Sequence, residues 1–180
     1  MVQAFGPALP QTLEAFIDWE PTDGFKYEWN DGEIIRSSGM KKKQYYVYDV
    51  LNSLFIEKGY HKAGTFMAEP DVMLTAFQMR RPDIAYFTRE QVQIGRRGED
   101  VIPAFVIEIL SETDQAYRIE EKIAEYFKAG VQVIWNINPE QEVVYVYTSR
   151  RHVTICLEED ICSAAPVLPD FTISVNTLFA

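Results

Sequence analysis

The sequence predicts a single domain of mixed α/β class, spanning 1–180, and three patterns support that prediction. Two apolar runs, 81–87 and 103–111, are rich in Ile, Val, Phe and Tyr, as central strands are. The segments 44–58 and 111–130 carry apolar residues at helical spacing. An Asn-Asp-Gly turn at 30–32 joins two alternating stretches, which indicates a β-hairpin.

Length and composition place the chain among globular proteins. Its 180 residues are enough for a substantial core, and 47% of them are hydrophobic. No apolar run is long enough for a membrane span, and the first residues lack the features of a secretory signal. Cys156 and Cys162 are too few for a disulfide scaffold or a four-ligand zinc site. We therefore expect a cytoplasmic protein without a membrane partner.

The charge balance gives no direct support for nucleic-acid binding. The formal net charge is −10, whereas contact with phosphates favours a basic surface. A cluster of metal-binding carboxylates would add negative charge of its own, and local basic patches can coexist with an acidic total. Three short basic runs, 41–43, 80–81 and 96–97, are candidates for phosphate contact, although such runs are more often solvated surface.

The N-terminal part predicts a helix followed by the hairpin. Residues 12–19 form a short amphipathic pattern, and 25–36 alternates around the 30–32 turn. Asn and Gly tolerate the positive φ that such a turn needs. Glu28 and Glu33 would then lie on the two arms of the hairpin.

The middle of the chain predicts a second helix and further strands. The helix over 44–58 should end at Gly59, and the lysines at 41–43 oppose its dipole. Residues 61–75 predict one or two strands with a turn near 68–70, and the polar segment 88–102 is expected to be a loop that lies over a groove.

The C-terminal part predicts a third helix and a meander. Ser111 and Asp114 resemble the two polar members of a capping box, so we expect a helix to open there and to end at 129–130. Three segments are expected to be strands: 131–137, 142–148 and 152–158. Residues 171–179 close the chain.

Two acids stand where buried strands normally carry none. Asp83 and Glu108 each interrupt an apolar run, and a buried ionised carboxylate is costly unless it is paired or binds a metal. The intervening chain is long enough for a loop and a return strand, so the two acids could meet on neighbouring strands. Paired acids also serve glycosidases, but no sugar cleft is indicated. Ligation of Mg²⁺ or Mn²⁺ by strand-borne oxygens fits better.

A lysine is the expected companion of such a metal pair. The position two after Glu108, on the same face of the strand, is Leu110. Lys122 lies beside the apolar stripe of the following helix and is the candidate replacement. Its side chain could instead lie over the edge of the core with only its amine in water.

Short motifs in a fixed order run along nearly the whole chain. They are Tyr27-Glu28, Asp31-Gly32-Glu33, Pro82-Asp83-Ile84, 105–111, Lys122 with Tyr126, Gly130-Val131 and 134–139. Together they resemble the Uma-two family of proposed restriction endonucleases, within the PD-(D/E)XK nuclease superfamily. The resemblance implies a restriction-endonuclease-like core, in which helices flank a mixed central sheet and an Asp and a Glu hold a divalent metal.

The resemblance also implies roles for individual residues. Asp83 and Glu108 would bind Mg²⁺ or Mn²⁺ together with the main-chain carbonyl of Ile109. Lys122 would orient the attacking water, and Glu28, with Glu33 as the alternative, would be an additional N-terminal acid of the catalytic site.

Three positions depart from the pattern of the resemblance. Leu110 replaces the usual lysine of the superfamily, although this replacement is common in the branch. No histidine occurs in 37–46, where many relatives carry one, and Gln44 is the nearest polar match. Asn138 stands where relatives often have Asp.

Three functions are compatible with the sequence. The leading hypothesis is a metal-dependent endonuclease that hydrolyses phosphodiester bonds in DNA, for which a homodimer would supply one active site for each strand. The alternative is an inactive nuclease-like fold that binds nucleic acid or protein. A small-molecule hydrolase that uses the same acids is the third.

Overall fold

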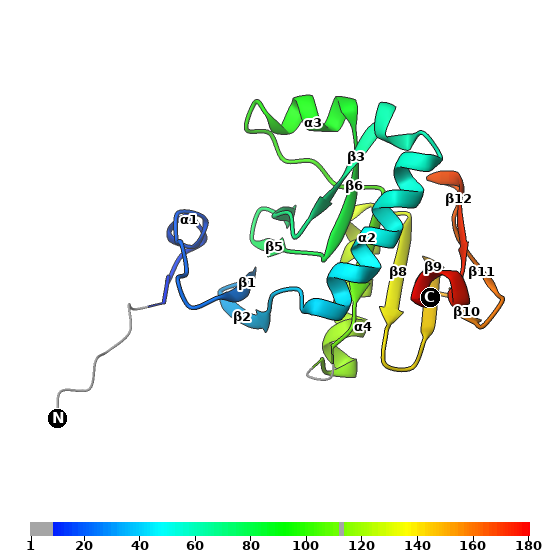
Figure 1. Cartoon of the computed structure of the whole chain (residues 1–180). Coiled ribbons are helices and arrows are strands. Elements are labelled where there is room, and N and C mark those ends of the chain that lie inside the picture. Colours follow the sequence, from blue (N-terminus) through cyan, green and yellow to red (C-terminus); the bar gives the residue numbers. More distant parts are fainter. Residues whose placement is uncertain (1–8, 112–113) are drawn as a thin grey trace.

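The structure is a computed structural model that describes residues 9–111 and 114–180. Its centre is a six-stranded mixed sheet with the order β10-β9-β8-β7-β6-β3 (Figure 1). The strands are β3 (Gly64–Ala68), β6 (Ile84–Thr88), β7 (Phe105–Ile109), β8 (Val133–Asn138), β9 (Val143–Ser149) and β10 (His152–Leu157). β7 and β8 are parallel and the other neighbours are antiparallel. The predicted mixed sheet is therefore confirmed.

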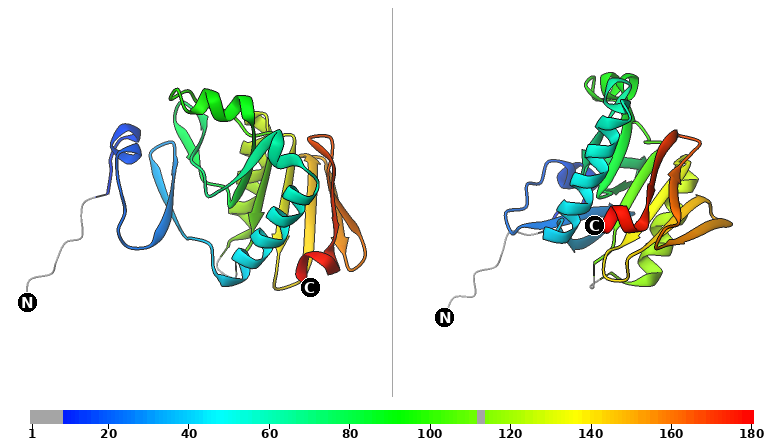
Figure 2. Two further views of the ribbon diagram at one scale, coloured as in Figure 1. Left: turned by 45° about the horizontal axis from the view of Figure 1, so that its top comes forward. Right: turned by 45° about the vertical axis from the view of Figure 1, so that its right-hand side comes forward.

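Two helices cover opposite faces of this sheet (Figure 2). α2 (Lys42–Glu57) buries Leu51 and Phe55 against β7 and β8, in the larger core cluster. α4 (Ala116–Ala129) buries Ile123 and Tyr126 against the other face, in a second cluster. The crossover from β7 to β8 runs through α4, as parallel strands require.

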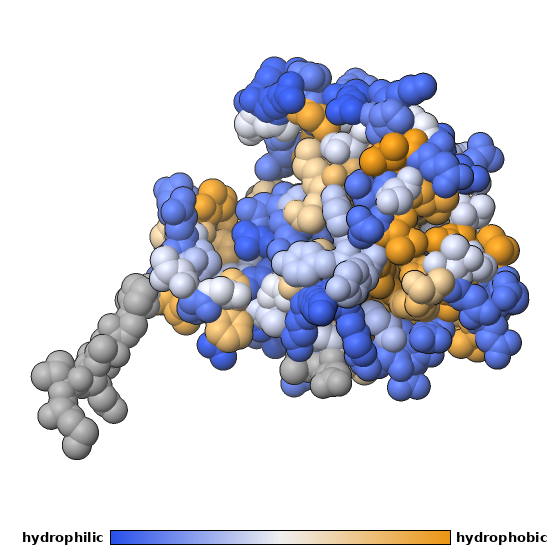
Figure 3. Space-filling model, in the orientation of Figure 1, coloured by the Kyte–Doolittle hydropathy of each residue, from blue (hydrophilic) through white to orange (hydrophobic). Residues whose placement is uncertain are grey.

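The C-terminal elements extend the α2 side. They are β11 (Ile161–Ala164), β12 (Leu168–Ser174) and α5 (Val175–Phe179). β11 and β12 form a two-stranded sheet whose buried side chains join the larger cluster. The surface beside α2 and these elements is rich in hydrophobic residues, whereas the surface over the segment after β6 is mostly hydrophilic (Figure 3).

A second, four-stranded antiparallel sheet lies beside the central one, with the order β2-β1-β5-β4. Its strands are β1 (Phe25–Asn30), β2 (Glu33–Ser38), β4 (Val72–Thr75) and β5 (Gln78–Arg80), and α1 (Leu13–Ile17) packs on it. The predicted hairpin is β1–β2, with positive φ at Asp31 and Gly32. Two consecutive positive φ values are the signature of a type I′ turn.

Several local predictions were wrong. The segment 88–102, expected to be a loop over a groove, contains α3 (Arg89–Gly95), which starts with a capping box between Thr88 and Gln91. β5 and β11 were not predicted, because strands of three and four residues give almost no periodic signal.

The start of α4 also differs from the prediction. The helix begins at Ala116 with Gln115 as its N-cap, and not at Ser111. The Asp114 carboxylate does accept a hydrogen bond from the Ser111 N–H at 2.7 Å, while residues 112 and 113 of the predicted opening lie outside the described residues. No helix in 9–111 or 114–180 is both long and apolar enough to cross a bilayer.

Candidate functional site

A pocket of about 470 Å³ opens between the β1–β2 hairpin, the end of β7 and α4. Its lining contains most of the buried polar and charged side chains of the described chain, together with the half-buried Glu108 and Lys122. The buried ones are Lys26, Glu28, Gln44, Arg80, Asp83 and Asn136.

The two strand-borne acids, Asp83 and Glu108, meet at the floor of this pocket. Asp83 directly precedes β6, and the antiparallel pairing of Ile84 with Ile107, continued by one residue, brings Asp83 opposite Glu108 on β7. One Asp83 oxygen, Oδ2, accepts a hydrogen bond from the Ile109 N–H at 2.7 Å. The predicted meeting of the acids on neighbouring strands is thus present.

A lysine that sequence reasoning missed neutralises Asp83. The Nζ of Lys26 donates to Oδ1 of Asp83 at 2.7 Å, and both side chains are 7% exposed. Burial opposes the charge of Lys26, but Asp83 and then Glu108 outweigh it and raise the lysine pKa. The available signal was position, because Lys26 lies two residues before Glu28 and therefore shares its face of β1.

Glu108 is held from α4 by two side chains. Its Oε1 accepts a hydrogen bond from the Tyr126 hydroxyl at 2.6 Å and lies 3.0 Å from Lys122 Nζ. Burial raises the pKa of Glu108, and the Lys122 charge only partly offsets this. Burial, and after it the negative charge of Glu108, also raises the pKa of Tyr126, so the phenol stays protonated and donates its hydrogen bond.

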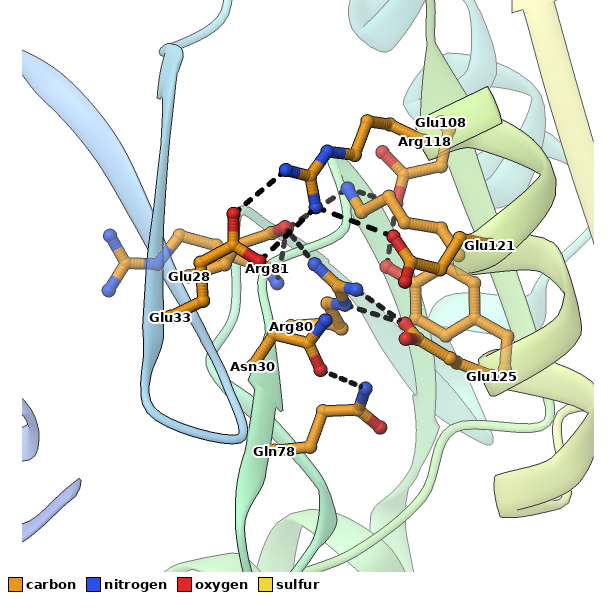
Figure 4. Close-up of polar contacts among 12 residues, drawn as sticks. Glu28, Asn30, Glu33, Gln78, Arg80, Arg81, Glu108, Arg118, Glu121 and Glu125 are labelled. Atoms are coloured by element: carbon orange, nitrogen blue, oxygen red, sulfur yellow. Dashed lines mark hydrogen bonds and ion pairs between the residues drawn. The ribbon is translucent and has the colours of Figure 1, made fainter. Parts of the chain in front are cut away.

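Glu28 is held by two cationic side chains and a main-chain N–H; its contact with Arg80 is drawn in Figure 4. Its Oε1 lies 2.9 Å from Lys122 Nζ and accepts from the Arg81 N–H at 2.9 Å, while its Oε2 accepts from Arg80 at 3.1 Å. Burial alone would raise its pKa, but Lys122 and Arg80 outweigh burial and lower the pKa to about 2. Glu28 is therefore ionised at any physiological pH.

Lys122 bridges two carboxylates of the pocket, those of Glu28 and Glu108. Its Nζ is within 3.0 Å of both Glu28 and Glu108, and its side chain is 18% exposed. Burial opposes its charge, yet Glu108 and Glu28 outweigh burial and raise the lysine pKa. Lys122 thus reaches the pocket that sequence reasoning assigned to it, as a protonated amine.

Arg80, one of the basic residues considered for phosphate contact, is instead part of the interior. It is 1% exposed, and its guanidinium lies 2.7 Å from Glu125 and 3.1 Å from Glu28 (Figure 4). Arg80 is therefore too deeply buried to be a solvated surface residue or to contact a phosphate. The ion pairs depend on β5, which the sequence did not predict.

Glu33, the alternative to Glu28, lies at the mouth of the pocket. It is exposed and lies 2.8 Å from Arg118 of α4. The other two basic runs are on the surface, where Lys43 lies 2.7 Å from Glu140 and Arg97 lies 2.8 Å from Glu99.

Gln44 reaches the site from the first turn of α2. Its Nε2 donates to the carbonyl oxygen of Ile109, and its Oε1 accepts from the Lys41 N–H at 2.6 Å. The residue that stands near the expected histidine therefore touches the main-chain oxygen that the resemblance assigned to a metal.

The oxygen atoms at the pocket floor are of the kind that hard cations prefer. Asp83, Glu108 and the Ile109 carbonyl supply oxygens only, which Mg²⁺ and Mn²⁺ prefer, and Mg²⁺ usually takes one or two carboxylates and keeps several waters. No group of three or more His, Cys, Asp or Glu side chains suited to a metal occurs among the described residues, so the two carboxylates here would need the Ile109 carbonyl and waters to complete the coordination. A buried amide oxygen in the same pocket, Oδ1 of Asn136, has no protein partner. The residues present fit a hydrated divalent cation.

Comparisons with known proteins identify the family of the chain and a similar fold. The profile of the Uma2 family, described as "Putative restriction endonuclease", matches residues 13–176. The fold is similar to a crystal structure from Anabaena variabilis, described as "a putative nuclease belonging to DUF820". The TM-score is 0.73 at 23% sequence identity, over 94% of this chain and 98% of that one. The comparison with curated proteins finds no match.

Proposed function

Because the chain belongs to the Uma2 family, we propose that it is a divalent-cation-dependent endonuclease that hydrolyses phosphodiester bonds in DNA. One observation carries the proposal. Asp83 and Glu108 converge at the floor of a pocket in which Lys122 lies 3.0 Å from Glu108. Buried acids on adjacent strands, with a buried amine beside them, are costly to maintain for stability alone.

The acids at the pocket floor would bind the cation. Asp83, Glu108 and the Ile109 carbonyl would hold Mg²⁺ or Mn²⁺, and the cation would supply positive charge to the phosphate and to the attacking water. Hydrolysis joins the water oxygen to phosphorus, breaks one P–O ester bond and returns a proton to the leaving oxygen.

Lys122 contributes as a cation and not as a base. Burial disfavours its charge, but Glu108 and Glu28 overcome that cost and raise its pKa, so it enters the reaction protonated. A protonated amine can donate hydrogen bonds to the attacking water and to a phosphate oxygen, and it can offset developing negative charge. Glu28 holds Lys122 in place through an ion pair, and Tyr126 holds Glu108 in place through a hydrogen bond.

Two arginines that line the pocket are candidates for contact with a phosphate backbone, Arg36 of β2 and Arg118 of α4. Arg118 is ion-paired with Glu33 and Glu121, which a phosphate would replace as its partner. These two side chains would guide the DNA strand despite the acidic total charge of the molecule.

The test is cleavage of supercoiled plasmid with Mg²⁺, with Mn²⁺ and with chelator, for wild type, Asp83→Asn and Lys122→Ala. Two surface variants are matched controls: Asp71→Asn, whose side chain is 56% exposed, and Lys128→Ala, on the exposed side of α4. We expect cation-dependent nicking that only the first two variants lose. Retained nicking in Lys122→Ala would remove the role given to Lys122 and leave the cation site standing.

A second candidate function is a non-catalytic module that binds nucleic acid. The observation in its favour is that Lys26 and Lys122 neutralise Asp83 and Glu108 without a metal. A wild type that neither nicks plasmid nor binds Mn²⁺, but that still retards DNA in a gel, would select this function.

A further inference from the structure

Asn136 is a polar residue in the middle of a buried strand. Its neighbours in β8, from Val133 to Ile137, are apolar and buried, and Asn136 itself is 3% exposed. A buried amide without hydrogen-bond partners loses its interactions with water and destabilises the fold. The position therefore needs an explanation beyond packing.

The sheet register places Asn136 beside the two acids. Glu108 pairs with Asn136 between β7 and β8, and Asp83 lies opposite Glu108 on the other side. These three residues, on β7, on β8 and just before β6, form one row, which we call the polar row. The next row on the same face, Ala85, Val106 and Ile134, is apolar and belongs to the core under α4.

The amide oxygen of Asn136 has no partner among the described residues. One other buried atom has the same status, Nη2 of Arg80, but it lies 2.7 Å from a Glu125 oxygen and that ion pair accounts for it. No such neighbour exists for Asn136 in the described chain. Because Asn136 lines the pocket, a molecule bound in the pocket is the remaining candidate partner for this oxygen.

We propose that Asn136 is a positioning residue whose amide oxygen accepts a hydrogen bond from a water of the hydrated divalent cation at Asp83 and Glu108. The inference rests on the proposed function, since it needs that cation. Adjacent strands are about 4.8 Å apart, so Asn136 is one strand from Glu108 and two strands from Asp83. That spacing favours contact with a water beside Glu108 over direct ligation between the two acids.

Such an outer contact changes metal affinity measurably. Groups that hold the ligands or waters of a metal typically alter its affinity by 10-fold to 100-fold when they are removed. Replacing the amide by an apolar side chain of similar size should also remove the unpaired oxygen from the metal-free protein. The substitution should therefore weaken metal binding while it stabilises the metal-free protein. A purely structural role of Asn136 would not give this combination.

The experiment is calorimetric titration of the full chain with Mn²⁺, together with thermal unfolding without metal. For Asn136→Leu we expect Mn²⁺ affinity to fall about 10-fold to 100-fold and Tm to rise. Asn136→Asp keeps an acceptor oxygen and should retain or increase Mn²⁺ affinity, and it serves as the binding test if the leucine variant fails to fold.

The matched control is Asn138→Leu, two residues further along β8. The Asn138 oxygen already accepts from the N–H groups of Glu140 and Gln141 at 3.1 and 3.2 Å. This variant should lower Tm and leave Mn²⁺ affinity unchanged.

The outcomes separate this inference from the proposed function. Unchanged Mn²⁺ affinity in Asn136→Leu, beside a wild type that binds, overturns the role of Asn136 and leaves the cation site intact. Loss of binding in Asn136→Asp overturns it as well. A wild type that binds no Mn²⁺ overturns the proposed function and the inference together.

Discussion

The two faces of β7 differ in what they bury. Phe105, Ile107 and Ile109 point towards α2 and belong entirely to an apolar cluster. Val106 and Glu108 point towards α4, where an apolar row is followed by the polar row. Because successive side chains of a strand point to opposite faces, one five-residue strand serves both a core and a site.

The α2 face is held together by aromatic rings. Phe105 contacts Phe66, Trp135 and Phe171 at centroid distances of 6.2, 5.4 and 6.2 Å. Tilted and edge-on contacts of this kind add to the energy of burial. The comparison teaches that the fold can carry charge on the α4 face of β7 while the three β7 side chains on the α2 face are all apolar.

The largest effect should follow damage to the apolar face. Trp135→Ala removes a fully buried ring, and we expect the free energy of unfolding to fall by roughly 3–5 kcal/mol. Urea unfolding measures this loss. Nicking activity per folded molecule should be unchanged, and a selective loss of activity would contradict the division between the faces.

Removal of the Glu108 charge on the α4 face should have an effect of comparable size, but on cleavage activity and not on stability. Glu108→Gln keeps an oxygen for the Tyr126 hydroxyl but loses the charge that would hold a cation. We expect cleavage to fall roughly a thousandfold, about 4 kcal/mol in the barrier. Burial raises the pKa of Glu108, so a neutral isostere should change the free energy of unfolding by only about 1 kcal/mol. A large loss of stability would show that the acid is structural.

The next effect is a pH dependence of stability that originates at Glu28. Its folded pKa of about 2 lies below its ordinary value of 4.5, so its stabilising contribution is complete above pH 4.5 and disappears as the pH falls towards 2. Glu28→Gln should therefore be less stable than wild type by about 3 kcal/mol at pH 7.

Unfolding at a series of pH values tests this prediction. The difference between wild type and Glu28→Gln should shrink between pH 4.5 and 2. Glu33→Gln, on the other arm of the hairpin and exposed, is the control and should show a much smaller difference. A constant difference across this range would mean that Glu28 acts through packing.

The smallest effect should come from the exposed ion pair at the pocket mouth. Arg118 lies 2.8 Å from Glu33, and their side chains are 34% and 54% exposed. Arg118→Gln should therefore change the free energy of unfolding by less than about 1 kcal/mol, and the change should diminish with added salt. A salt-independent loss of several kcal/mol would place this pair with the buried cluster.

The site residues that could be predicted are those that interrupt an apolar pattern in the sequence. Asp83 and Glu108 stood out as acids in apolar strands, and Lys122 stood out beside an apolar stripe. Lys26 was missed because its partner, Asp83, lies at the edge of the other sheet, and Arg80 was missed because its partners lie on β1 and α4. No local sequence pattern encodes how these elements pack together. Asn136 also interrupts an apolar run, but only the parallel register of β7 and β8 shows that it lies beside Glu108.

The same limits apply to the fold. The long helices, the 30–32 hairpin and the mixed sheet followed from periodicity, turn chemistry and the resemblance. Short elements did not, because β5 has three residues and α3 depends on a cap that resembles loop sequence. Prediction failed where a few local hydrogen bonds decide the structure.

Lys122 joins parts of the chain that are made at different times. Its amine lies within 3.0 Å of Glu28 in the N-terminal hairpin and of Glu108 in the central sheet. During synthesis the hairpin leaves the ribosome long before α4 is complete. A nascent chain therefore cannot assemble this charge cluster until α4 has been made.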